Sequence, residues 1–159
     1  MSDNHWETQP RKDNGEFTYR YEFWKQKLKA MEEMNKNPEV SKKYDGGSYC
    51  ELRKKYKYNS NIEVHHMPAV SASYLPKRMG PSIAVDIKDH EKTSSYKSSR
   101  SAKKYRARQR MLVGNKNFLA AQEMDFTNLI RKTGYRYAKA MLEKLEYDKK
   151  LYDEGVIYG

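Results

Sequence analysis

Residues 62–67, Ile-Glu-Val-His-His-Met, form the segment that most restricts how this chain can fold. Apolar and polar side chains alternate along the segment, and Ile62 and Val64 are β-branched. This pattern predicts a half-buried β-strand. Neighbouring residues on a strand point to opposite faces, so His65 and His66 are not expected to bind one metal ion together. The segment therefore predicts a strand that ends in two imidazoles with different roles.

A second strand and a helix are predicted downstream of the His pair. Residues 68–81 are rich in proline and predict a long loop, and residues 82–85 predict a short strand. Asp86 can then cap a helix that carries Asp89 and His90. Because Asp86 lies four residues before His90, both can face the same way. Asp86 is therefore a candidate metal ligand, with the helix N-cap as its alternative role.

We expect the three histidines of this region to have different roles around one catalytic metal ion. Imidazole binds transition metals and transfers protons near neutral pH. We expect His65 and His90 to bind the ion and His66 to act as general base on a water molecule. Glu63 lies on the same strand face as His65 and is expected to orient an imidazole or a catalytic arginine. The single cysteine excludes a disulfide within the chain and a zinc site built from cysteines.

The charge balance predicts an anionic partner. A formal net charge of +11 attracts polyanions, and nucleic acid is the commonest of them. An anionic membrane surface is the main competitor. Residues 99–113 predict a basic helix, whose charged face could also be merely solvated. The side chains expected to contact phosphates are Lys77, Arg78, Lys103, Lys104, Arg106, Arg108 and Arg110.

Composition permits a single domain with a modest core. A mean hydropathy of −1.12 approaches the disordered range, but 14 tyrosines can bury their rings and keep their hydroxyls hydrated. We expect a polar, flexible tail over residues 1–16 and one domain over residues 17–159. No apolar run approaches the ~20 residues of a membrane span, and the tail lacks the apolar segment of a signal peptide.

The pattern along the chain predicts an α+β fold that is mainly helical. Two short strands and a helix would form a small core, and further helices would surround it. These further helices are expected over residues 17–37, 48–55, 99–113, 117–124, from 125 or 127 to 133, and 135–152, with a turn over residues 45–47.

The stretch Glu63-Val64-His65-His66-Met67-Pro68 resembles the HNH/endonuclease VII superfamily, the ββα-metal nucleases, and is most similar to bacterial toxin members such as nuclease colicins. Residues 80–86, Asp89-His90, residues 93–95 and residues 105–109 resemble segments of the same members. The resemblance implies a ββα-metal core over about residues 60–98. In such families the first His of the pair binds the metal and the second activates water, which agrees with the roles given above. The Asn of the usual triplet has no match here, which leaves the third ligand open.

The resemblance implies a metal-dependent, sequence-nonspecific endonuclease that hydrolyses DNA and serves as an antibacterial toxin domain. Its cofactor would be one divalent ion, Mg²⁺, Mn²⁺, Ni²⁺ or Zn²⁺. We expect a monomer, neutralised in its producer by an acidic immunity protein. It would act in the cytoplasm of a target bacterial cell, delivered by a specialised secretion system or within a larger effector. The alternatives are a non-catalytic basic nucleic-acid-binding protein and a ribonuclease toxin that uses His66 without metal.

Overall fold

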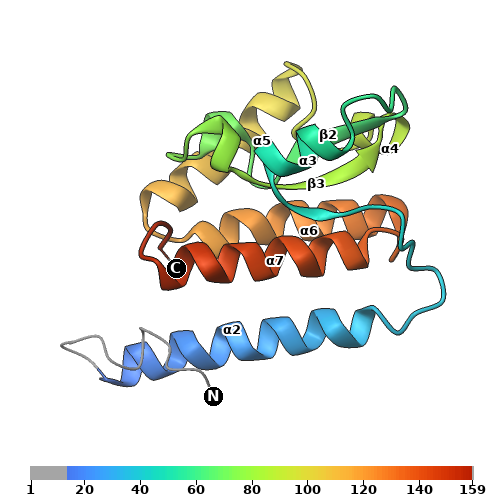
Figure 1. Ribbon diagram of the computed structural model, residues 1–159. Helices are drawn as coiled ribbons and strands as arrows, with labels where there is room; N and C mark the ends of the chain where they lie inside the picture. The colour runs from blue at the N-terminus through green and yellow to red at the C-terminus, as the bar shows by residue number, and fades with distance from the viewer. Residues whose placement is uncertain (1–13, 159) are drawn as a thin grey trace.

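The structure is a computed structural model that describes residues 14–158, with side chains from residue 22 onward. It confirms an α+β fold that is mainly helical. The helices are α2 (Asn14–Met34), α3 (Tyr49–Lys55), α4 (Ile87–Glu91), α5 (Arg100–Gly114), α6 (Phe118–Thr133) and α7 (Ala138–Asp153). The strands are β1 (Gly46–Ser48), β2 (Ile62–His66) and β3 (Pro81–Asp86). Figure 1 shows the sheet lying over α6 and α7, α2 packed on the far side of α7, and α3 on the opposite side of the sheet.

The three strands form one antiparallel sheet in the order β1-β3-β2. Residues 81–85 of the central strand β3 are all buried, because both faces of this strand are covered. β2 lies at an edge of the sheet and pairs His65 with Ile83 and His66 with Ser82. An edge strand is open along its outer margin, so side chains from both of its faces can border one cavity. The His pair is therefore placed at an open edge of the sheet.

The core is built where α2, α6, α7 and the sheet meet. Trp24 and Met31 of α2 are almost fully buried, as their helical spacing predicts, and they belong to one apolar cluster with Ile83 of β3 and Leu145 of α7. The helix that carries them begins at Asn14, earlier than the predicted residue 17. The rest of the predicted tail lies outside the described residues.

The helix predicted over residues 48–55 is confirmed as α3. Ser48 caps this helix by accepting a hydrogen bond from the backbone N–H of Glu51. The turn predicted over residues 45–47 is wrong, because Gly46 and Gly47 pair with β3 as strand β1. A Cβ on Gly46 would lie 1.9 Å from the carbonyl oxygen of Ala140, so only glycine lets β1 lie this close to α7.

Residues 118–133 form one helix, α6, where two were predicted. Asp125 or Thr127 was expected to begin the second of them, but the carboxylate of Asp125 lies inside the protein. The Tyr105 hydroxyl donates to Oδ1 of Asp125 at 2.8 Å, and Nε2 of Gln109 donates to Oδ2 at 2.7 Å. Burial raises the pKa of Asp125 to about 7. Asp125 therefore does not start a helix, and its carboxylate connects α6 to α5 through these two hydrogen bonds.

A second buried polar group lies between α6 and α7. The ammonium of Lys144 is fully buried and pairs with Oδ2 of Asp148 at 2.7 Å. It also donates to Oε1 of Gln122. Burial raises the pKa of Asp148 to about 6 and lowers the pKa of Lys144. An ion pair placed this deep must be complete, because a lone buried charge is strongly destabilising.

Candidate active site

His65, His66 and His90 line one cavity of about 250 Å³. The edge strand β2 supplies the pair and α4 supplies His90. The remaining wall includes Val70 and residues 95–97. The structure thus brings together the three histidines that the sequence pattern singled out.

The imidazole of His66 is held in a defined orientation. Its Nε2 lies 2.9 Å from the carbonyl oxygen of Lys77, and its ring stacks on Tyr49 with the centroids 4.2 Å apart. Because a carbonyl oxygen only accepts, Nε2 must carry the proton, and Nδ1 keeps its lone pair. Burial lowers the pKa of His66, although the bond to the Lys77 carbonyl opposes this shift. His66 is therefore a neutral imidazole whose Nδ1 can accept a proton.

Glu63 orients the imidazole of His90. Nδ1 of His90 donates to Oε1 of Glu63 at 2.7 Å, and Nε2 of His90 takes no part in this bond. The rings of His65 and His90 lie with their centroids 4.7 Å apart. Burial, reinforced by the neighbouring imidazoles, holds the pKa of His65 well below its ordinary value, so this ring is also neutral. Two adjacent imidazoles, one of them fixed by a carboxylate, fit the donor set of a divalent transition metal.

Asp86 is not brought to these imidazoles. Its Oδ2 accepts a hydrogen bond from the Tyr44 hydroxyl at 2.8 Å and lies 3.5 Å from Nη1 of Arg136. It occupies the N-cap position of α4, but its side chain makes no capping hydrogen bond. Within residues 22–158, no group of three or more His, Cys, Asp or Glu side chains is placed to hold a metal ion. Of the three predicted ligands, His65 and His90 line the cavity and Asp86 does not.

Asp89 fixes the helix that carries His90. Its carboxylate is buried and accepts hydrogen bonds from the Tyr137 hydroxyl and from Nη1 of Arg136, the latter at 3.1 Å. These bonds lower the pKa of Asp89 against the opposing effect of burial. They connect α4 to the segment that precedes α7. Asp89 therefore holds the position of α4, a role that its place beside His90 in the sequence could not reveal.

The basic helix α5 supports the cavity wall. Nη1 of Arg106 donates to the carbonyl oxygens of Ser95 and Lys97 at 2.6 and 2.7 Å. Nε of Arg110 donates to the carbonyl oxygen of Ser71 at 3.1 Å. These two guanidinium groups were expected to contact phosphates, but they hold loops that border the cavity. The other predicted phosphate contacts, Lys77, Arg78, Lys103, Lys104 and Arg108, are exposed.

If the protein is the DNA endonuclease expected from the sequence, Arg106→Gln should lower the rate of DNA cleavage. It should not change how the affinity for DNA depends on salt concentration. The segment 95–97 loses two hydrogen bonds, and a displacement of about 1 Å in a site can cost on the order of a hundredfold in rate. Lys103→Gln, the matched control on the same helix, should instead lower the slope of log affinity against log salt by about 0.9. Single-turnover rates and salt titrations on both variants check this. A slope that changes for Arg106→Gln as it does for Lys103→Gln would assign Arg106 to phosphate binding.

Sequence patterns did not reveal several residues of the site. Tyr49 stacks on His66, Tyr96 lies edge-on to His90 with centroids 4.9 Å apart, and the Lys77 carbonyl fixes the tautomer of His66. No sequence motif marks an aromatic ring that stacks on a histidine or a backbone carbonyl that accepts a hydrogen bond from one. Such groups are identified only once the fold is known.

No protein-family model matches the chain, and searches of the curated proteins and of the solved structures find no similar protein. None of the described helices is long and apolar enough to cross a membrane.

Proposed function

We propose that this protein is a metal-dependent endonuclease that hydrolyses DNA phosphodiester bonds without sequence specificity. The observation that carries the proposal is the cavity in which His65, His66 and His90 meet, where the Lys77 carbonyl holds Nε2 of His66 and Glu63 holds Nδ1 of His90. The order of β2, β3 and α4 along the chain is that of the ββα-metal core that the Glu63–Pro68 motif resembles.

In the proposed reaction His66 is the general base. Its Nδ1 takes the proton of the attacking water, and the resulting imidazolium is stabilised by the Lys77 carbonyl on Nε2. His65 and His90 would hold the divalent ion, and Glu63 keeps His90 in the required tautomer. When bound, such an ion supplies Lewis-acid stabilisation of the charge on the phosphate and the leaving oxygen.

The charge of the protein supports a polyanionic substrate. Lys77 and Arg78 are exposed on the 3₁₀ turn η2 (Lys77–Met79), whose first residue also holds His66 through its carbonyl. Cationic side chains at this place can bind the phosphates on either side of the cleaved bond, and phosphate contacts carry no base information. We extend the proposal to an antibacterial toxin delivered into a target cell. The charge of +11 suits neutralisation by an immunity protein with an acidic face.

The test is digestion of plasmid DNA and of RNA with Mg²⁺, Mn²⁺, Ni²⁺ or Zn²⁺, with EDTA as the control. DNA cleavage that needs a metal is expected. His90→Ala should weaken metal binding and cleavage together, since it removes a ligand, and calorimetric titration measures the first of these. Unchanged metal affinity in His90→Ala would contradict the assignment of His90.

A metal-independent ribonuclease is the second candidate. The imidazoles of His66 and His90, which line one cavity, could also serve as an acid–base pair: one would accept the proton of a ribose 2′-hydroxyl, and the other, in its protonated form, would give a proton to the leaving oxygen. The same digestion separates the candidates, because cleavage of RNA that persists in EDTA would support the ribonuclease. A protein that binds nucleic acid but cleaves neither substrate would be a non-catalytic binding protein.

A further inference from the structure

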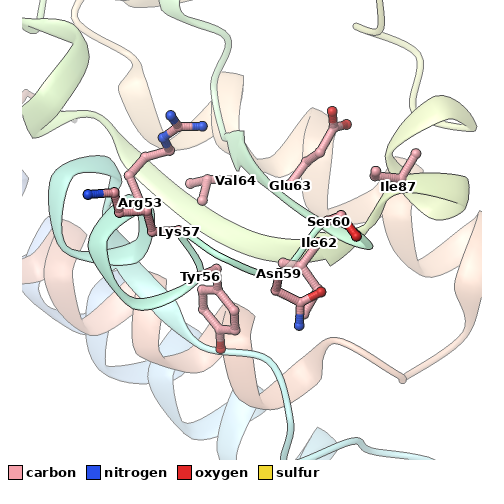
Figure 2. Close-up of a pocket in the computed structure, with 9 residues that line it drawn as sticks. All are labelled: Arg53, Tyr56, Lys57, Asn59, Ser60, Ile62, Glu63, Val64 and Ile87. Carbon is pink, nitrogen blue, oxygen red and sulfur yellow. The ribbon is translucent and has the colours of Figure 1, made fainter.

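A second cavity, of about 210 Å³, lies beside the imidazole cavity. It opens between α3 and β2, and Val64 lines both cavities. Figure 2 shows Arg53 and Lys57 at one end of this second cavity, Glu63 and Ile87 at the other, and Val64 between them. Its volume is below the roughly 300–1,000 Å³ that is usual for pockets binding free small molecules. A single unit of a polymer is therefore a better match in size.

The second cavity offers hydrogen-bond donors and positive charge. Among the described side chains, neither Arg53 nor Lys57 has a carboxylate partner, whereas Glu63 is already bonded to His90. Oδ1 of Asn59 accepts from the backbone N–H of Asn61 at 3.0 Å, which leaves the amide NH₂ of Asn59 as a donor. This combination of two cations and a neutral donor suits an anionic phosphate with a polar sugar or base attached.

An exposed aromatic ring stands next to this cavity. Tyr58 lies in the chain between Lys57 and Asn59, which both line the cavity, and it is 91% exposed. Nζ of Lys57 lies 5.3 Å from the centroid of its ring. Proteins that bind single-stranded nucleic acid combine cationic grooves with aromatic rings on which bases stack. A base can stack on such a ring only if it is unpaired, because a paired base already stacks within its duplex.

We propose that Arg53, Lys57 and Tyr58 form a subsite that binds an unpaired nucleotide of the substrate strand next to the cleaved phosphate. The proposal rests on the nuclease function and adds a preference for single-stranded nucleic acid. The shared residue Val64 places the subsite beside the imidazoles, so one continuous strand can occupy both cavities.

Binding to His66→Ala protein tests the subsite separately from catalysis. A fluorescent oligonucleotide of about twelve residues is titrated as a single strand and as a duplex, over a range of salt. Tyr58→Ala should weaken single-strand binding by about tenfold and leave duplex binding nearly unchanged, while Tyr58→Phe keeps wild-type affinity. Because Tyr58 is exposed, neither change should disturb the fold.

The two cations have a matched control of equal charge. Arg53→Gln with Lys57→Gln should reduce the salt slope for the single strand by about 1.4, at ~0.7 for each phosphate contact. Lys54→Gln with Arg131→Gln, two exposed residues that do not line the cavity, should leave the slope unchanged. The subsite is refuted if Tyr58→Ala leaves single-strand affinity intact, or if both double variants change the slope equally. If the wild-type protein binds the single strand in a Tyr58-dependent way but cleaves no nucleic acid, only the nuclease proposal is overturned.

Discussion

His66→Ala is expected to lower DNA cleavage by about 10²–10⁴-fold and to leave metal affinity nearly unchanged. The imidazole donates through Nε2 to the Lys77 carbonyl and stacks on Tyr49, so its remaining nitrogen can accept the proton of water. In the proposed function, metal binding depends instead on His65 and His90. Single-turnover cleavage and calorimetric metal titration of the same variant measure the two effects separately. A large loss of metal affinity would mean that His65 and His66 exchange roles.

Gly80→Ala is the companion variant, since it displaces His66 without removing it. A Cβ at Gly80 would lie 2.5 Å from Cδ2 of His66, so the ring must move. Misplacement of a catalytic group by about 1 Å can cost on the order of a hundredfold, so a partial loss is expected. Full activity in Gly80→Ala would show that the observed orientation of His66 is not needed.

Lys144→Met is expected to lower the free energy of unfolding by about 3–5 kcal/mol, because Asp148 then lacks its partner in the core. Lys144→Met with Asp148→Leu should recover most of this loss, since buried ion pairs are often replaceable by apolar side chains. Urea unfolding of the wild type and both variants measures these differences. Equal losses in the single and double variants would show that packing, and not charge pairing, is the main contribution of Lys144.

The loss of unfolding free energy that Lys144→Met causes should depend on pH. Burial raises the pKa of Asp148 to about 6, above its ordinary 3.8, so the folded state binds more protons than the unfolded state between these values. The contribution of Asp148 to the free energy of unfolding therefore falls as pH rises through this window. Loss of the Lys144 ammonium raises the pKa of Asp148 further, and that of nearby Asp125 with it. The deficit should thus be largest near neutral pH and shrink toward pH 4.

The elements that could be predicted are those stabilised by neighbouring residues in the chain. The alternation of residues 62–66 indicates β2, and Ser48 and Ser99 accept the capping hydrogen bonds that begin α3 and α5. The apolar spacing of Trp24 and Met31 predicts the buried face of α2. These signals act over one or two turns, so the sequence carries them directly.

The elements that were missed depend on residues distant in the chain. Gly46 and Gly47 form β1 only because β3 pairs with them and α7 leaves room for no Cβ on Gly46. Asp125 resembles a helix start, but Tyr105 and Gln109 of another helix use its carboxylate, and α6 continues through it. Local propensity is weak enough for such tertiary contacts to override it.

Residue type and spacing were enough to single out His65, His66 and His90 and to place them on a strand and a helix of one short region. The atoms that these imidazoles present depend on contacts made in three dimensions. Glu63 bonds Nδ1 of His90, and the Lys77 carbonyl bonds Nε2 of His66. Asp86 accepts a hydrogen bond from the Tyr44 hydroxyl, and Arg106 donates to backbone carbonyls. A hydrogen bond is set by the positions of two groups in space, so residue type and spacing name the candidates but cannot pair them.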